Sequence, residues 1–308
     1  MKADWVAASV RARSLALRRV GAGASHEIAA KRNLAAGLEL LAGTVYGERL
    51  AGCTSLADAE RSTRETVLWQ LRVLAGWVPA TGTRLVRAAA AAFERENILD
   101  LAESLAAGGP APQPFDVGSL STAWNRLRTA RSLDELTEGV RSSPWDEGGS
   151  LDLPVARDEL TVVSLRRLAT VAPAARPWAE AASALIVARI VLVDRSAASR
   201  PLIRLVRPLL GEDWERSRDL RGMVAAFPRT TQEIFRGVTS PKDLWRAEAG
   251  LRSLCESDGF RLLRGSLPGP DIILGAIAVL ATDAWRVRAA LASAAEGLGS
   301  SEVLDVVA

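Results

Sequence analysis

Apolar residues recur along most of this 308-residue chain at intervals of three and four, which is the spacing of one helix face. The longest such stripe, near the C-terminus, comprises Ile273, Ile277, Leu280, Ala284, Val287 and Leu291. Shorter stripes occur at Val67, Leu71, Leu74 and Val78, and at Leu34, Leu38, Leu41 and Val45. Residues 178–193 are apolar on all sides, which is typical of a buried helix. Only residues 160–165 have any strand character, so the pattern predicts an all-α protein.

Capping signals locate the starts of two helices. Ser55 followed by Asp58, and Ser132 followed by Glu135, have capping-box spacing. They predict helices that begin at 56 and 133, the second running to about Val140.

Breaks in the helical pattern divide the chain into three blocks. The run Gly-Gly-Pro-Ala-Pro-Gln-Pro at 108–114 cannot continue a helix and predicts a linker. A second break lies at 208–211. We therefore expect domains at 1–109, 110–211 and 212–308, each of ordinary domain size. The blocks are faintly alike: each has a short helix ending in a turn with a Thr, Ser or aromatic residue (40–46, 136–145, 223–231), and each later has a long helix with an early acidic residue.

The composition excludes most kinds of catalytic and metal-binding site. The chain has one histidine, His26, and two distant cysteines, Cys53 and Cys255, so it offers no metal-ligand cluster and no disulfide scaffold. Phosphate-loop and metalloprotease motifs are absent. The adjacent letters Ser25, His26 and Glu27 point in different directions on a helix, and we expect Ser25 to be an N-cap. The sequence predicts no catalytic residue, no cofactor and no bound metal.

The charge pattern narrows the choice of partners. A net charge of +3 is near neutrality, and only the N-terminal segment concentrates basic residues, so nucleic-acid binding is not expected. No window holds 18 uncharged apolar residues, so no transmembrane span is expected. Nearly all of the 39 basic residues are arginine.

Two charged residues lie on apolar stripes. Arg13 shares a stripe with Val6, Val10 and Leu17, and Glu96 shares one with residues 85, 89, 92 and 99. An unpaired buried charge costs several kcal/mol. Two interpretations stay open: a snorkelling arginine and a solvated glutamate, or two residues that face a polar cavity or one another.

Several segments in the correct order carry a family resemblance. They are Trp5-Val-Ala-Ala-Ser-Val-Arg-Ala-Arg13, Leu40-Leu-Ala-Gly-Thr-Val-Tyr46-Gly-Glu-Arg-Leu-Ala-Gly52, residues 93–105 with the linker and Gly118-Ser-Leu120, residues 248–260, and the helix 272–291 with Arg286 and Arg288. Together they resemble the C subunit of bacterial and archaeal V/A-type ATPases, called subunit d in eukaryotes, which has a Leu-Leu-x-x-Thr-x-Tyr turn near its N-terminus.

The resemblance implies a fold and a role. The fold would be three similar helical domains around a pseudo-threefold axis, forming a funnel. The role would be the non-catalytic central-stalk subunit, the rotor socket that joins the central shaft to the membrane rotor ring. It would transmit torque for ATP-coupled proton or sodium transport. We would then expect one copy per complex, located in the cytoplasm and peripheral on the cell membrane. The alternative is a stand-alone helical scaffold protein derived from this family.

Five residues are candidates for an interface or a polar cavity: Arg13, Tyr46, Glu96, Asp283 and Arg288. The sequence also departs from the family pattern of Asp/Glu-x-x-Asn-Leu in the repeat helices. Asp100 stands at the asparagine position in the first repeat, and Arg286-Val287 replaces Asn-Leu in the third. Arg200-Pro201 replaces it in the second, where we expect the proline to kink the helix.

Overall fold

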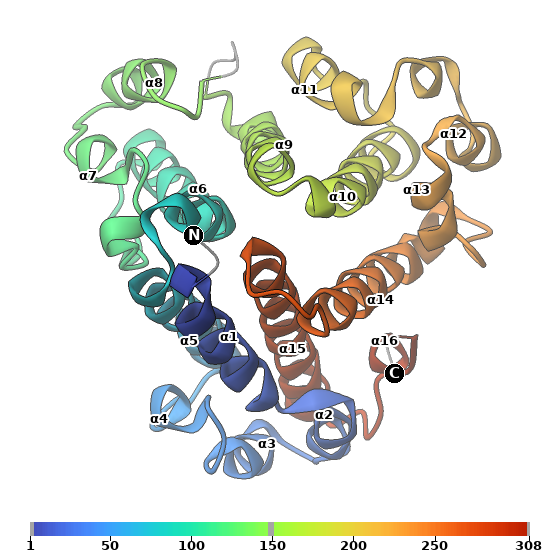
Figure 1. Ribbon diagram of the computed structural model, residues 1–308. Coiled ribbons are helices and arrows are strands. Elements are labelled where there is room, and N and C mark those ends of the chain that lie inside the picture. Colours follow the sequence, from blue (N-terminus) through green and yellow to red (C-terminus); the bar gives the residue numbers. More distant parts are fainter. Residues whose placement is uncertain (1–2, 147–150, 307–308) are drawn as a thin grey trace. The chain divides into compact units, whose positions relative to one another are not determined.

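Helices joined by loops make up the part of the chain that the computed structural model describes, residues 3–146 and 151–306 (Figure 1). No residue in these ranges is in a β-strand, which confirms the all-α prediction. Residues 160–165 lie inside helix α9 (Leu153–Val171). Ala156, Leu160 and Val163 are buried there at helical intervals, so the run belongs to a longer 3.6-residue pattern.

The chain divides into two compact units, which are described separately. The first consists of residues 1–82 and 245–308, and the second of residues 83–244. These boundaries differ from the expected breaks at 109 and 211, and the division into three domains stays a prediction.

Long helix α15 is the centre of the first unit. The helices of this unit are α1 (Val6–Leu17), α2 (Gly21–Ala29), α3 (Leu34–Leu41), α4 (Gly47–Leu50), α5 (Leu56–Trp77), α14 (Leu244–Leu263, from Trp245 onward), α15 (Pro270–Glu296) and α16 (Glu302–Val306), with 3₁₀ turns at Ala3–Trp5 and Ala80–Gly82. Helices α1, α2, α3 and α5 all pack on α15. The predicted α15 stripe is buried along its whole length.

Small residues allow close packing in this unit. Helix α1 packs on α15 and buries Ala8, Ala12 and Ala16. The stripe of Val6, Val10 and Leu17 on the same helix is exposed instead, since Leu17 is 78% exposed. A face of small side chains brings two helix backbones closer together, so the alanine face can be buried in preference to the face with larger side chains.

The second unit contains the remaining helices. They are α6 (Thr83–Ala107), α7 (Trp124–Leu127), α8 (Leu133–Arg141), α9, α10 (Arg176–Ala188), α11 (Arg200–Leu210), α12 (Leu220–Ala226) and α13 (Arg229–Ile234), with a π-helical turn at Arg189–Val193 and 3₁₀ turns at Gly118–Leu120, Pro173–Ala175, Asp213–Arg216 and Pro241–Asp243. Helix α9 packs on α6, α10 and α11, and α10 packs on α11 and α13. The buried helix expected at 178–193 corresponds to α10 and the π-helical turn.

Both predicted capping boxes form helix starts. The Ser55 hydroxyl accepts from the Asp58 N–H at 3.1 Å, and the Ser132 hydroxyl accepts from the Glu135 N–H at 3.2 Å. The expected linker is also present, because α6 ends at Ala107 and no helix forms before Gly118.

Two local expectations were wrong. Pro201 does not kink a helix, because it lies in the first turn of α11, where its missing N–H has no helical partner to lose. Ser25 is not an N-cap, because α2 begins four residues earlier at Gly21. The Ser25 hydroxyl instead donates back to the Gly21 carbonyl at 2.8 Å.

Candidate functional site

A buried tyrosine–aspartate pair joins three segments of the first unit. Asp283 on α15 accepts hydrogen bonds from the backbone N–H groups of Val20 at 3.1 Å and Gly21 at 2.8 Å, at the start of α2. The Tyr46 hydroxyl donates to the same carboxylate at 2.9 Å. Neither Asp283 nor Tyr46 has any exposed surface. Asp283 therefore caps one helix while it holds the turn that carries Tyr46.

The turn before Tyr46 has a local cause in the sequence. The Thr44 hydroxyl donates to the Leu41 carbonyl at 2.7 Å and accepts from the Tyr46 N–H at 3.2 Å. Such hydroxyl turns end a helix by offering its backbone an alternative partner. The Leu-x-x-Thr-x-Tyr pattern thus sends the tyrosine ring back toward α15.

Burial alters both acids of this pair. It raises the pKa of Tyr46 well above its usual value, and the Asp283 charge raises it further. Burial also raises the pKa of Asp283, although its three hydrogen-bond donors oppose that effect. The tyrosine therefore keeps its proton and donates a hydrogen bond to the aspartate.

The second unit contains an arrangement of the same kind around Glu94 on α6. One oxygen, Oε1, accepts from the N–H groups of Thr122 at 2.8 Å, Ala123 at 2.6 Å and Trp124 at 2.6 Å, at the start of α7. The other, Oε2, accepts from the Trp145 indole N–H at 3.2 Å. Glu94 is 1% exposed and Trp145 is 2% exposed.

The two aromatic residues are positioned by matching turns. The Ser143 hydroxyl donates to the Val140 carbonyl at 2.7 Å and accepts from the Trp145 N–H at 3.1 Å, as Thr44 does for Tyr46. Each aromatic residue also follows a helix N-cap by thirteen residues, from 33 to 46 and from 132 to 145. We call each combination of a buried acid, a capped helix and a bonded aromatic an acid–aromatic joint.

The last block keeps part of this pattern without the joint. Helix α12 has Asp219 as its N-cap, and Met223 is buried four residues later, as Leu136 is in α8. The acid on α10 is Glu180, which accepts from Arg176 at 2.8 Å. Among the described residues, the buried hydroxyls of Ser183 and Thr231 have no hydrogen-bond partner.

The helices that carry these three acids, α6, α15 and α10, each have a buried polar residue three positions after the acid. Asn97 follows Glu94, Arg286 follows Asp283, and Ser183 follows Glu180. The Asn97 amide binds both backbone groups of Phe115, at 2.9 and 2.7 Å, and so holds the end of the linker against α6. Arg286 forms a bidentate ion pair with Glu256 of α14, with 2.6 Å between Nη2 of Arg286 and Oε2 of Glu256.

The structure brings together only two of the five candidate residues, Tyr46 and Asp283. Arg13 instead donates to the carbonyls of Leu263 at 3.0 Å and Gly265 at 2.6 Å, at the end of α14. Glu96 lies 3.8 Å from Arg157 of α9.

Arg288 lies 3.7 Å from Glu60 of α5, and both side chains are partly exposed. Whether any of the five candidates contacts a partner stays a prediction.

Glu94 and Trp145 are not among the residues that the sequence predicts for this site. The predicted residue, Glu96, is two positions along α6 and therefore lies on a different face of the helix. Two signals could have located the joint: the acid-x-x-Asn spacing of Glu94 and Asn97, and the Ser-x-aromatic turn at 143–145, which parallels Thr44-Val-Tyr46.

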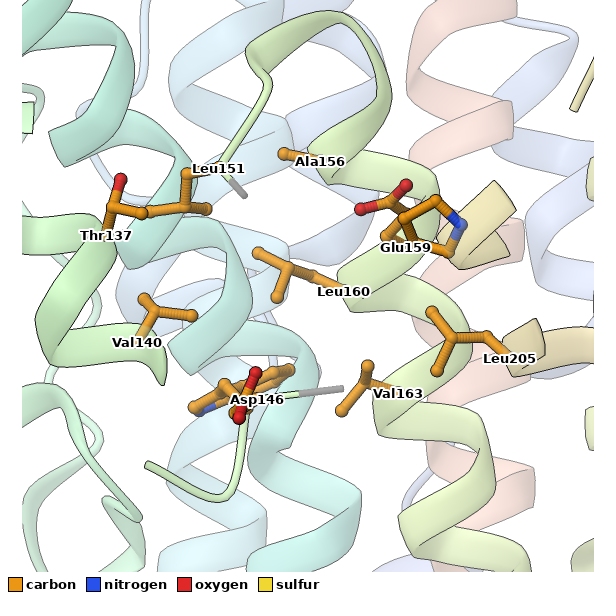
Figure 2. A pocket seen from close by; sticks show the side chains of 11 residues that line it. Thr137, Val140, Asp146, Leu151, Ala156, Glu159, Leu160, Val163 and Leu205 are labelled. Atoms are coloured by element: carbon orange, nitrogen blue, oxygen red, sulfur yellow. The ribbon is translucent and has the colours of Figure 1, made fainter. Parts of the chain in front are cut away.

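A small cavity lies beside Trp145, lined mainly by residues from α8, α9 and α11 (Figure 2). Its volume of about 30 Å³ is enough for about one water molecule. Asp146 and Glu159 both line it. The Ser199 hydroxyl donates to Glu159 at 2.5 Å, and burial raises the pKa of Glu159. Val140, Leu160 and Val163 supply an apolar wall.

Over the described ranges, no three His, Cys, Asp or Glu side chains are grouped so that they could hold a metal ion. The helices in the same ranges include none with the length and apolar character needed to cross a bilayer. No protein-family model and no curated protein matches this sequence.

Proposed function

We propose that this protein is the central-stalk, rotor-socket subunit of a V/A-type rotary ATPase. In that role it binds the central shaft and the membrane rotor ring, and it transmits torque between ATP turnover and the transport of protons or sodium ions. It is not itself an enzyme. Its location is then the cytoplasmic face of the membrane, as a peripheral part of the complex.

The observation that carries this proposal is the recurrence of the acid–aromatic joint on two long helices. Helices α6 and α15 have 25 and 27 residues, so each is about 40 Å long. A part that transmits torque needs stiff connections between such rods and the shorter helices around them. Hydrogen bonds to a charged group contribute about 1.5–3 kcal/mol each, and each joint has three or more. The joints therefore resist shear at the points where short helices meet long ones.

Three residues of the joints, Tyr46, Glu94 and Asp283, lie in segments that carry the family resemblance. Tyr46 is the tyrosine of the Leu-Leu-x-x-Thr-x-Tyr turn, and its partner Asp283 belongs to the closing helix. The matching turn at Trp145 supports an internal repeat, and the block around α12 keeps its N-cap and buried residue. A three-domain funnel around a pseudo-threefold axis is the arrangement that we propose for these repeats.

Co-purification tests the proposal directly. The chain is co-expressed with the shaft and ring subunits of a rotary ATPase from the same cells, and tagged chain is purified in detergent. We expect a stable complex that contains both partners, and reduced ATP-driven ion pumping when the chain is left out of the assembly.

The control omits the shaft subunits from the same preparation. A chain that stays monomeric with shaft and ring both present would refute the proposal and favour a stand-alone helical scaffold. Arg13→Gln, Glu96→Gln and Arg288→Gln variants then test whether these candidates contribute to the interfaces.

A further inference from the structure

The first helix of the first unit exposes a row of apolar side chains. Val6, Val10 and Leu17 of α1 are 48%, 60% and 78% exposed, and their spacing places them on one side of the helix. The row is about 16 Å long from Val6 to Leu17. The alanine side of the same helix is the one that packs on α15, so the row is left facing outward.

The loop between α14 and α15 lies beside this row. Arg13 of α1 donates to the Gly265 carbonyl at 2.6 Å, near the start of the loop, and the Gly269 N–H donates to the Ser9 hydroxyl at 3.3 Å, at its end. Leu267, between these two contacts, is 62% exposed. Both ends of the loop are thus held against α1. We call the following four residues the apolar face: Val6, Val10, Leu17 and Leu267.

The two segments that form the apolar face are rich in arginine and contain no acid. Residues 5–25 include four arginines and residues 259–270 include two, and neither stretch has an aspartate or a glutamate. The acids that border these stretches are Asp4, Asp258 and Asp271. Six arginines less these three acids still leave three positive charges, so the surroundings of the face are positive.

Two of these arginines are exposed at the edges of the face. Arg18 directly follows Leu17, and Arg264 lies three residues before Leu267. Among the acids of α5 and α15, the helices that pack on α1, Glu60 and Glu65 form ion pairs and Asp283 is buried in its joint. The apolar face therefore has a cationic border.

Protruding aliphatic side chains favour a fluid partner over a folded one. A protein that bound Leu17 and Leu267 would need a fitted pocket for each, and leucine and valine are under-represented among the residues that dominate protein interfaces. A bilayer yields around such side chains and takes them into the boundary between headgroups and acyl chains. Its phosphate groups also match the planar fork of an arginine.

We propose that the apolar face docks this protein on the surface of a membrane that contains anionic lipids. The four apolar side chains enter the headgroup boundary, and Arg18 and Arg264 bind lipid phosphates around them. The contacts of Arg13 and Ser9 with the loop hold Leu267 in place before binding, which lowers the entropy cost of docking. This inference does not depend on the proposed role in a rotary ATPase.

Flotation of the purified chain with protein-free vesicles tests the inference. One set of vesicles contains equal parts of phosphatidylcholine and phosphatidylglycerol, and the other contains phosphatidylcholine alone. We expect the chain to float with the anionic vesicles and to bind the neutral ones at least about tenfold more weakly, since arginines near an anionic surface add to the affinity. Added salt should weaken the binding to the anionic vesicles.

Two double variants separate the apolar contribution from the charged one. Leu17→Gln with Leu267→Gln should weaken binding to anionic vesicles at least about tenfold, because two leucines no longer leave water. Arg18→Gln with Arg264→Gln should also weaken it at least about tenfold, but should change binding to neutral vesicles by less than about twofold. All four side chains are exposed, so the fold should be kept.

The matched control is Leu298→Gln. Leu298 is 68% exposed and belongs to the same unit, but it lies beyond the other end of α15. Its replacement should change vesicle binding by less than about twofold, because binding depends on the apolar area that enters the membrane. Circular dichroism and a melting curve confirm that each variant is folded.

The inference is overturned if the chain does not float with anionic vesicles, if it binds neutral vesicles equally well, or if the control loses as much binding as the leucine pair. It is also overturned if the leucine pair leaves vesicle binding unchanged and instead abolishes co-purification with the shaft or ring subunits. That result would assign the apolar face to a protein partner. Because the vesicles contain no protein, failure of the rotary ATPase proposal would leave the flotation results unchanged.

Discussion

Replacement of Glu94 by glutamine tests the acid–aromatic joint most directly. The amide has nearly the same shape, and its oxygen can still accept from the three N–H groups at the start of α7. Two effects lower the stability of the variant. The hydrogen bonds to the N–H groups of α7 no longer involve a charge, which costs about 1 kcal/mol or more. In addition, the amide NH₂ of the glutamine now faces the Trp145 indole N–H. Both groups are donors, so the buried indole N–H of Trp145 loses its acceptor, which costs about 1–3 kcal/mol.

The expected destabilisation is therefore about 3 kcal/mol, a large share of the stability of an ordinary domain. Urea denaturation, followed by far-ultraviolet circular dichroism and tryptophan fluorescence, measures it. The matched control is Glu138→Gln, an exposed glutamate in the same unit with a side chain that is 74% exposed. Its effect should stay within about 0.5 kcal/mol.

A double-mutant cycle isolates the bond between Glu94 and Trp145. Trp145→Phe removes the indole N–H, so Glu94→Gln should cost at least about 1 kcal/mol less in that background. If the two effects add within about 0.5 kcal/mol, or if Glu94→Gln alone costs less than about 1 kcal/mol, the reasoning behind the joint is refuted.

Three further predictions concern the first unit. Tyr46 is the only tyrosine in the chain, so near-ultraviolet tyrosinate absorbance reports it alone. Because the pKa of Tyr46 is raised in the native state, the unfolded chain loses this proton first as pH rises above about 10. The free energy of unfolding should therefore fall as pH rises above about 10, and it should fall less in Tyr46→Phe. Ionisation of Tyr46 in the native state near pH 10 would contradict this expectation. Gly275→Ala should destabilise the protein by about 1–3 kcal/mol in thermal melts, since the new Cβ would lie 2.6 Å from the Gly259 carbonyl oxygen. The control Gly76→Ala, at an exposed helix position, should stabilise it by up to about 1 kcal/mol. Equal effects of the two substitutions would exclude tight α14–α15 packing. Glu256→Gln should destabilise by about 3 kcal/mol in urea, because it removes the negative charge that buried Arg286 binds through two nitrogens. A loss below about 1 kcal/mol would show that the pair is not needed.

Local and periodic signals in the sequence were enough to predict that the chain is helical and where several helices lie. The capping boxes at Ser55 and Ser132 define helix starts through contacts within four residues, so no tertiary information is needed. The stripe from Ile273 to Leu291 is long enough that its 3.6-residue period leaves one interpretation, and it is buried as expected.

Choices between nearby alternatives needed the tertiary structure. Glu94 and Glu96 are both acidic residues of α6, and the difference is that only Glu94 faces the N–H groups of α7, a segment about 30 residues away in the chain. On α1 the alanine face is buried and the stripe of larger apolar residues is exposed, because close approach to α15 favours small side chains.

The sequence by itself thus determined the all-helical class, where several helices begin and that Tyr46 lies in the turn after a short helix. Only the tertiary structure decided which acid is buried and that Tyr46 meets Asp283. The physical reason is range. Helix propensity and capping act between residues a few positions apart, whereas burial of a charge depends on donors that the fold brings from distant parts of the chain.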